Sequence, residues 1–494
     1  MKFLGIDVGS SSVKVSVFDA DKQQTLASTF FPKSELAINS PVQGWAEQDP
    51  STWWESIKGG LKEISTQTNL KEVAGIGISY QMHGLVAVDK DKNPVRPSII
   101  WCDSRAVETG NEAFNNIGHE KSLSHLLNSP GNFTAAKLGW VKENEPDLYS
   151  KINKVMLPGD FVAMKLSGEI NTTSGGMSEG VFWDFKNRKV SADVKGYFGF
   201  DDELIPPLMP IIGEQSRVSE SAAAELGLSS GIPITYRAGD QPNNALSLNV
   251  LEPGELATTA GTSAVIYAVS DKNEYDPDSR VNTFLHVNDK DGTSRNGILL
   301  CVNGSGILYS WLKKLLSIGG ELDYPALNDL ASQAPIGADG LCFMPFGNGA
   351  ERILKNQNLG AQMINLDFNR HGSAHMVRAA KEGIVNAMNY GLEIIRSMDV
   401  PTTKIRAGAS NLFLSPLFRE AFVNTTGVPL ELYETDGAEG AARGAAIGAG
   451  YQTYKEAFDK LKLISIISPT EALMSNYQQS YQDWKGELNK LLNV

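Results

Sequence analysis

The first twenty residues alternate apolar and polar positions in a way that predicts a β-hairpin. Apolar side chains recur at every second position from Leu4 to Val8 and again from Val13 to Val17, and Gly9-Ser10-Ser11-Ser12 separates the two runs. A period of two places such side chains on one face of a strand, and a Gly-Ser segment is typical of a tight turn. We therefore expect strand, turn and strand.

Helical and strand-like spacings alternate further along the chain. Residues 73–80 (VAGIGISY) and 84–89 (GLVAVD) have the apolar character of buried strands, whereas residues 50–66 repeat apolar positions at helical spacing. Helical spacing recurs at 304–316, 373–398 and 415–426. Strands that alternate with helices indicate an α/β fold.

The opening hairpin has a second copy about half a chain later. GSSSVKVSV at 9–17 aligns without gaps on GTSAVIYAV at 261–269, with one Gly, one Ser and two Val in common. A match this short also arises by chance. If it is a true repeat, the chain is a duplicated domain, and the two Gly-Ser/Thr turns face each other across a cleft that accommodates a phosphate chain.

The length of 494 residues predicts two domains, because a single hydrophobic core stops growing at roughly 250 to 300 residues. Turn signals between 206 and 244 place the boundary near 245, which gives domains of 1–245 and 246–494. The Ala/Gly-rich run at 437–451 is expected to be a helix packed closely against a sheet.

Composition excludes several classes of protein. Hydrophobic residues make up 41% and charged residues 20%, no apolar run approaches a membrane span, and the N-terminus does not resemble a signal peptide. We therefore expect a soluble, cytoplasmic protein. The net charge of −13 argues against nucleic-acid or membrane-surface partners. Its three widely spaced cysteines predict reduced, mostly buried thiols.

Familiar phosphate-binding and metal motifs are missing from the sequence. It has no GxxxxGK[ST] loop, no protein-kinase motif set and no GxGxxG after a strand. His371 and His375 lack the Glu of a zinc protease, so we interpret them as surface histidines.

Asp7 is the first candidate for chemistry, because it ends a buried strand two residues before the Gly9 turn. A carboxylate there is costly unless it serves a cation or a hydrogen-bond network. One interpretation is a Mg²⁺ site, reached through water, since Mg²⁺ takes one or two carboxylates together with phosphate oxygens. The alternative is an Asp that caps the turn.

Asp240 is the second candidate, since it follows the strand-like PITYRAG with Gln241 next to it. It has either the role of general base toward a substrate hydroxyl or that of a helix N-cap. His83, in QMHG after a buried strand, either binds a polar substrate or is an ordinary core histidine.

Taken together, these segments resemble the FGGY carbohydrate kinases, which include xylulose, glycerol, gluconate and fuculose kinases. The resemblance covers nearly the whole chain and rests on landmarks that stand in the family's order: GIDVGSSSVKVSVFD, WAEQDPSTWW, GISYQMHG, RPSIIWCDSR, FTAAKLGWV, LPGDFVAMKLSGE, GDQ, TAGTSAVI, GAERIL, AGASNLF and GAARGAAIGA. It implies an actin-like ATPase fold of two ribonuclease-H-like lobes, with ATP, Mg²⁺ and a sugar in the cleft between them.

The resemblance also implies roles for individual residues. Asp240 corresponds to the catalytic base and Asp7 to the acid near the metal. The residues on the ATP side are Ser10, Ser11, Lys14, Thr262, Gly304, Gly408, Ala409 and Asn411. Those on the sugar side are Met82, His83, Trp101, Asp103, Phe133, Asp240 and Gln241. The N-terminal lobe then binds the sugar and carries the first phosphate turn, and the C-terminal lobe binds the nucleotide.

QMHG and W-x-D-x-R are most similar to the xylulose kinases, because glycerol kinases have an Arg-Glu pair where Met82 and His83 stand. D-Xylulose is therefore the expected substrate. Two departures weaken this assignment. Gln241 stands where many xylulose kinases have Asn, and a usual triple glycine reads Ala407-Gly408-Ala409. A kinase for ribulose, gluconate or glycerol, or a non-kinase ATPase of the same fold, remains the alternative. A homodimer is left open.

Overall fold

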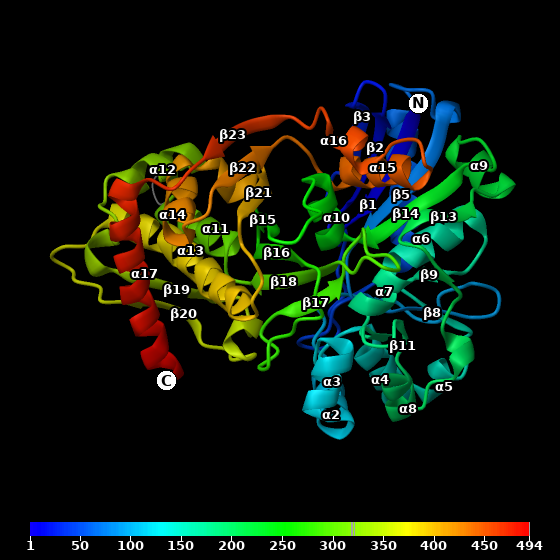
Figure 1. The fold of residues 1–494 in the computed structure, drawn as a ribbon, viewed down its shortest axis with the longest axis horizontal. Coiled ribbons are helices and arrows are strands. Elements are labelled where there is room, and N and C mark those ends of the chain that lie inside the picture. The colour runs from blue at the N-terminus through cyan, green and yellow to red at the C-terminus, as the bar shows by residue number, and fades with distance from the viewer. Residues whose placement is uncertain (318–319, 321, 494) are drawn as a thin grey trace.

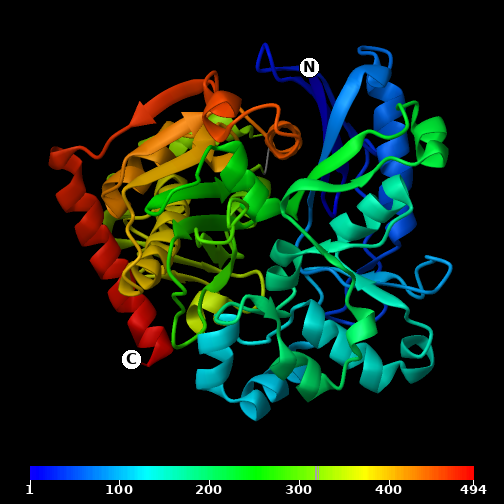
Figure 2. The ribbon, with the colours of Figure 1, turned by 45° about the vertical axis from the view of Figure 1, so that its right-hand side comes forward.

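Two sheets, one in each half of the chain, organise the fold of this computed structural model, which describes residues 1–317, 320 and 322–493. Figure 1 shows the N-terminal sheet on the right and the C-terminal sheet on the left, and Figure 2 shows the same two bodies turned by 45°. The two-lobed α/β architecture predicted from the sequence is confirmed.

The first sheet has the order β13-β14-β5-β1-β2-β3. Strands β1, β5 and β14 are parallel, while β2, β3 and β13 run antiparallel to their neighbours. The bounds are β1 (Lys2–Val8), β2 (Val13–Asp19), β3 (Gln24–Phe31), β5 (Val73–Tyr80), β13 (Ile212–Arg217) and β14 (Pro233–Gly239). The predicted hairpin and the buried strand at 73–80 are both confirmed.

The second sheet repeats this arrangement in the order β23-β22-β21-β15-β16-β18-β17. Here β15, β21 and β22 are parallel, and β16, β17, β18 and β23 are antiparallel to their neighbours. The bounds are β15 (Glu255–Ala260), β16 (Ala264–Ser270), β17 (Asn282–Leu285), β18 (Asn296–Val302), β21 (Lys404–Gly408), β22 (Leu430–Tyr433) and β23 (Leu463–Ile467). Strand β15 thus takes the place of β1, and β21 that of β5.

The two aligned segments occupy equivalent hairpins. Residues 9–12 connect β1 to β2, and residues 261–263 connect β15 to β16. The two sheets share the order of parallel and antiparallel neighbours around these hairpins, as a duplicated domain would have it. The predicted boundary at 245 falls within α10 (Asp240–Ser247), which lies between the last strand of the first sheet and the first strand of the second.

The Ala/Gly-rich run forms α15 (Gly437–Gly448), which crosses back and covers one face of the first sheet (Figure 1). A Cβ on Gly5 would lie 1.8 Å from Ala438 O, and a Cβ on Gly77 would lie 2.0 Å from Ala441 O. The sequence predicted that this helix packs closely against a sheet. It did not predict that the sheet is formed by the other half of the chain. Leu4, on the opposite face of β1, packs in the core formed with α1 (Pro50–Ile64) and α6 (Pro158–Ser167).

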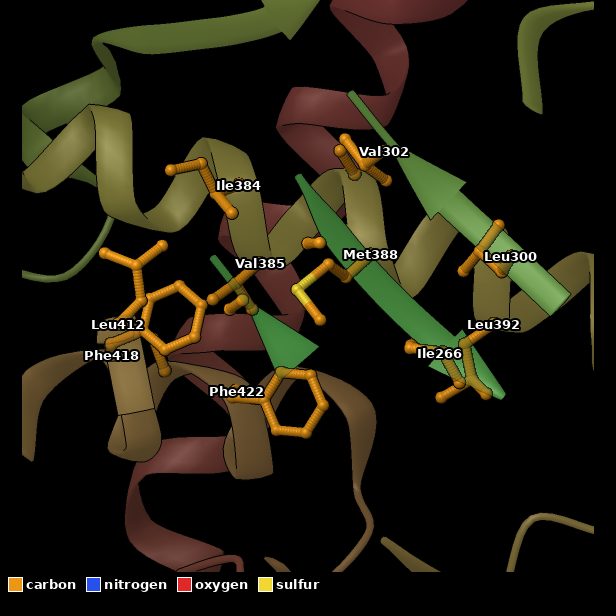
Figure 3. Packing of buried hydrophobic residues seen from close by; sticks show 14 of the residues in the cluster. Ile266, Leu300, Val302, Ile384, Val385, Met388, Leu392, Leu412, Phe418 and Phe422 are labelled. Atoms are coloured by element: carbon orange, nitrogen blue, oxygen red, sulfur yellow. The ribbon is translucent and has the colours of Figure 1, made fainter. Parts of the chain in front are cut away.

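The core of the second lobe lies around α13 (Ser373–Ser397). Figure 3 shows Met388 and Leu392 of this helix directed toward Ile266 and Leu300 on the strands, with Phe422 of α14 (Pro416–Thr426) nearby. The predicted helices at 304–316, 373–398 and 415–426 are therefore confirmed, the first as α11 (Gly306–Leu316).

The remaining longer elements surround these sheets. They are α2 (Val107–Ile117), α3 (His119–Leu126), α4 (Thr134–Asn144), α7 (Ser174–Glu179), α8 (Ala192–Phe198), α9 (Glu220–Leu226), α12 (Tyr324–Ser332), α16 (Tyr454–Phe458), α17 (Glu471–Leu492), β19 (Cys342–Phe346) and β20 (Gly360–Ile364). The strand expected at 84–89 is shorter, β6 (Val86–Val88).

The structure bears on two expectations from composition, which concern membrane-spanning helices and the cysteines. Within the part of the chain that the structure describes, no helix combines the length and apolar character that a membrane span requires. The expectation that the thiols are mostly buried is wrong, because Cys102 is exposed and Cys301 and Cys342 are partly exposed. Cys102 lies in a loop. Composition alone does not indicate whether a cysteine lies in a loop or in a buried helix or strand.

Candidate active site

The parallel strands β1, β5 and β14 end at one edge of the first sheet. Val8 is in register with Tyr80, and Tyr80 with Gly239, so the segments that follow these residues emerge side by side. The Gln81 N–H donates to Val8 O at 2.7 Å and ties two of these segments together. In parallel α/β sheets, ligands bind at such carboxyl ends. The segments are the Gly9–Ser12 turn, Gln81-Met82-His83 and Asp240-Gln241.

Asp7 lies on the face of β1 that α15 covers. A Cβ on Gly437, the first residue of α15, would lie 2.2 Å from Asp7 Oδ2, so the carboxylate contacts the helix N-terminus directly. Burial raises the pKa of Asp7, and the neighbouring charge of Asp436 adds to the effect. The turn after it is closed by a hydrogen bond from Gly9 N–H to Ser12 O, a bond between backbone atoms that does not use the Asp7 carboxylate.

Asp240 is the first residue of α10, and Gly239 occupies the N-cap position, so the N-cap interpretation of Asp240 is wrong. Burial raises the pKa of Asp240 to about 7, and the charge of Asp7 contributes. Burial raises the pKa of Cys301 on β18, and the charges of Glu351 and Asp240 add smaller effects. A carboxyl with a pKa near neutrality is suited to proton transfer.

Glu179, at the end of α7, lies against Gly239, the residue before Asp240. The sequence analysis did not identify it. A Cβ on Gly239 would lie 2.4 Å from Glu179 Oε2 and 2.5 Å from Met82 Cγ, so both side chains pack against the glycine before the predicted base. Burial raises the pKa of Glu179 well above its usual range, and the charges of Asp240 and Asp160 add to this. No local pattern in the sequence distinguishes Glu179 from other acidic residues.

His83 is enclosed by aromatic rings and has a left-handed backbone, with φ of 61°. Its ring centroid lies 4.8 Å from that of Phe133 and 5.2 Å from that of Phe284, a residue of the second lobe. Nδ1 lies 2.9 Å from Glu179 O, an acceptor, so Nδ1 carries the proton and Nε2 is free to accept. Burial lowers the pKa of His83 to about 3, and the imidazole is therefore neutral.

The predicted sugar-side residues Trp101 and Asp103 differ in exposure. Trp101 is 48% exposed, whereas Asp103 is buried. Both carboxylate oxygens of Asp103 are occupied, by the Ala46 N–H at 2.6 Å and by the guanidinium of Arg105. Asp103 thus orders its loop, and a contact between Asp103 and a sugar stays a prediction. Gln241 stands next to Asp240, and its buried Oε1 is without a hydrogen-bond partner among the described residues.

The first phosphate turn is anchored through its backbone. Ser10 O accepts from Gln48 Nε2 at 2.6 Å, and Ser11 O accepts from the Leu36 N–H at 2.8 Å. Lys14, opposite Asp7 on β2, places Nζ 2.6 Å from Asp436 Oδ2, the N-cap of α15. The turn therefore adjoins the start of a helix from the other half of the chain.

The predicted nucleotide residues gather at the matching edge of the second sheet. Thr258 of β15 is in register with Ala407 of β21, so Thr262 and the segment Gly408-Ala409 follow neighbouring strand ends. A Cβ on Gly261 would lie 3.5 Å from Asn411 Nδ2, and the Gly306 N–H donates to Gly261 O at 2.9 Å. The 408–411 segment is thus the counterpart of Gln81-Met82-His83 in the first lobe.

Gly304 has a steric reason to be glycine. A Cβ there would lie 1.4 Å from Pro345 O. The N–H groups of Asn303 and Gly304 donate to the Glu351 carboxylate, which fixes the loop before α11. Burial raises the pKa of Glu351 to about 7.

The donor set fits a divalent cation only in part. No group of three His, Cys, Asp or Glu side chains that could hold a metal is found among residues 1–317, 320 and 322–493. Asp7 supplies one carboxylate, and Mg²⁺ is commonly held by one or two carboxylates together with waters and substrate phosphates. The site therefore suits a cation that arrives with a nucleotide.

Comparisons with known proteins extend over both lobes. The model of the "FGGY family of carbohydrate kinases, N-terminal domain" matches residues 2–247, and that of the family's C-terminal domain matches residues 256–453. The chain is 28% identical to the xylulose kinase of Haemophilus influenzae, over 99% of this chain and 100% of that protein.

Two solved structures share the fold along nearly the whole chain. One, described as a xyloylose kinase from Brucella ovis, has a TM-score of 0.90 at 24% identity and covers 99% of both chains. The other, gluconate kinase from Lactobacillus acidophilus, has a TM-score of 0.89 at 20% identity and covers 99% of this chain and 98% of that chain. At these identities the likeness shows the fold.

Proposed function

This chain belongs to the FGGY family of carbohydrate kinases and is a phosphotransferase, and from that premise we propose that it phosphorylates D-xylulose to D-xylulose 5-phosphate with ATP. The observation that carries the proposal is the position of Asp240 at the edge where β1, β5 and β14 end, which also brings Met82-His83 and Asp7 to this edge.

In the proposed reaction, Asp240 accepts the proton of the sugar's terminal hydroxyl as the oxygen attacks the γ-phosphorus of ATP. The new O–P bond forms as the bond to the β-phosphate oxygen breaks, and ADP leaves. The raised pKa of Asp240 supports this role, because it brings the carboxylate close to the proton affinity that a base needs at neutral pH.

The two Gly-Ser/Thr turns are proposed to bind the phosphates from opposite lobes, Ser10 and Ser11 from one and Thr262 from the other. Lys14 would contribute a charge, and Gly304, Gly408, Ala409 and Asn411 would contact the adenosine. Asp7 would hold Mg²⁺ through water, and the ion would neutralise charge on the transferring phosphoryl group.

Met82 and His83 support a ketose as the acceptor. Together with Phe133 they offer an apolar wall and one neutral acceptor, Nε2 of His83, which suits a longer sugar better than a small triol. The name of the Haemophilus influenzae relative agrees with this choice.

A sugar acid is the second candidate, and Arg352 favours it. This half-buried arginine of the second lobe lies 5.4 Å from the Phe133 ring centroid. Its guanidinium donates to Ser129 Oγ, Ser279 Oγ and Ser279 O, which are all neutral acceptors. Its charge would pair with the carboxylate of an aldonate such as gluconate.

The deciding experiment measures ADP release, through a coupled assay, with D-xylulose, D-ribulose, glycerol and D-gluconate as acceptors. We expect D-xylulose to exceed glycerol in kcat/KM by a factor on the order of a hundred, because a site built for several hydroxyls loses heavily when they are absent. A higher kcat/KM for gluconate or glycerol would reject the ketose and leave the phosphotransfer intact.

A further inference from the structure

We propose that Lys137 is a positioning residue, which shapes the sugar pocket by holding two separate backbone segments at one buried amine. Its Nζ donates to His83 O at 2.8 Å and to Ile100 O at 3.0 Å. One acceptor lies in the Met82-His83 segment, and the other directly precedes Trp101. The inference rests on the proposed function, because it concerns the acceptor site of that reaction.

Helix α4 carries Lys137 and contacts the same segments with its first turn. Phe133, at its N-cap, packs against the His83 ring, and Thr134 Oγ1 donates to Gly84 O at 3.3 Å. Lys137 follows one helical turn later on the same face. The helix therefore holds the ring of His83, the carbonyl of His83 and the next carbonyl along the chain.

The backbone of His83 needs such support. A left-handed φ is unfavourable for a residue with a Cβ and persists only where the surroundings enforce it. Lys137 fixes the carbonyl of His83, and Glu179 O fixes its Nδ1. The direction of the free Nε2 is then determined from both sides.

Lys137 holds these segments through hydrogen bonds of defined direction and not through an ion pair. Both acceptors are neutral carbonyls, the side chain is fully buried, and burial lowers the pKa of Lys137 to about 7. An uncharged amine still has two N–H donors, which is the number of acceptors it meets. Loss of the amine would remove the hydrogen bonds that tie His83 O and Ile100 O to α4.

Lys381 in the second lobe provides a matched control. It is also fully buried, its pKa is also lowered to about 7 by burial, and it donates to Ser415 Oγ at 2.8 Å and to Asn328 Oδ1. Its contacts lie outside the Met82-His83 and Trp101 segments. A general cost of removing a buried amine is therefore common to both lysines, and an effect on the acceptor sugar is specific to Lys137.

The test compares Lys137→Met, Lys137→Gln and Lys381→Met in steady-state kinetics and thermal unfolding. For Lys137→Met we expect the KM for the acceptor sugar to rise about tenfold to a hundredfold while the KM for ATP changes by less than threefold, because misplaced binding groups cost that much. Lys137→Gln, which keeps two N–H donors on a shorter side chain, should recover part of the loss.

An unchanged acceptor KM in Lys137→Met would overturn the proposal, as would an equal rise in Lys381→Met. If Lys137→Met does not fold, Lys137→Gln decides alone, since a sugar KM equal to that of the wild type at lower Tm would mark a purely structural lysine. A wrong substrate assignment would be recognised separately, because the wild-type enzyme would then prefer an acceptor other than D-xylulose in the ADP-release assay. The Lys137 comparison is made with whichever acceptor the wild type uses best.

Discussion

Lys14 and Asp436 join the two halves of the chain, with Lys14 Nζ 2.6 Å from Asp436 Oδ2. Both side chains are about one third exposed, so the pair itself contributes little to stability. In the proposed reaction Lys14 exchanges this partner for a phosphate. Lys14→Met should therefore raise the KM for ATP about tenfold or more and leave the KM for the sugar unchanged in steady-state kinetics.

Asp436→Asn is the control for this prediction. Asn retains the capping of α15, where Asp436 Oδ1 accepts from the Glu439 N–H at 3.0 Å, but it removes the charge that pairs with Lys14. We expect no rise in the KM for ATP. A rise equal to that of Lys14→Met would show that the ion pair, and not a contact with phosphate, is what the nucleotide site requires.

Asp240→Ala should lower kcat by roughly a hundredfold or more, on the usual scale for loss of a general base. Nucleotide binding should persist, because the predicted contacts with ATP come from other residues. The measurement combines a coupled assay with the thermal shift produced by ATP. A variant that keeps more than about a tenth of the wild-type turnover would exclude Asp240 as the base.

Gly5→Ala should destabilise the protein by roughly 1–3 kcal/mol or more, because its Cβ would meet Ala438 O at 1.8 Å and displace α15 from the sheet. Urea unfolding measures the change. The control is Gly486→Ala, on α17, where a Cβ meets nothing within 4 Å. It should stabilise the protein by about 0.5–1 kcal/mol, as alanine does in a helix. Equal effects of the two substitutions would contradict the close packing of α15.

Acid should destabilise the protein through His286. Its Nε2 lies 3.0 Å from Val250 O and its Nδ1 lies 3.1 Å from Tyr267 Oη, so the neutral ring is satisfied. Burial lowers its pKa to about 3. Below pH of about 6.5 the unfolded chain binds the proton and the folded chain does not, so stability falls as the pH drops, by up to about 1.4 kcal/mol per unit.

The free energy of unfolding at pH 7 and pH 5, for wild type and His286→Gln, measures this term. The wild type should lose about 2 kcal/mol more than the variant over that interval. The difference cancels the contribution of His83, which also has a pKa lowered to about 3 and remains in both proteins. An equal loss in the two proteins would mean that His286 accepts a proton while folded.

The parts of the site that follow directly from strand ends could be predicted from the sequence. Asp7 and Asp240 each stand at the end of an apolar run, and register then brings both to one edge of the sheet. Phe284 could not be found in this way, since it reaches His83 from the other lobe, about two hundred residues along the chain. Glu179 ends a short helix that has no distinctive pattern.

The Ala/Gly-rich helix illustrates the same limit in the fold. Small residues indicate that another backbone comes close, but they carry no information about which backbone it is. Here it is the backbone of β1 and β5, reached after more than 350 residues of intervening chain. Side-chain patterns specify faces and spacings, and the choice of a distant partner depends on the whole topology.

The crossing of α15 restricts how this enzyme can be recombined with its relatives. A fragment cut near residue 250 would lack the helix that covers Gly5 and Gly77 and would leave that face of its sheet open to water. A chimera that exchanges the N-terminal half must therefore also take residues 437–448 from the same parent. Crossover points chosen from the linear order alone would pair a donor sheet with a foreign helix at contacts too close to adjust.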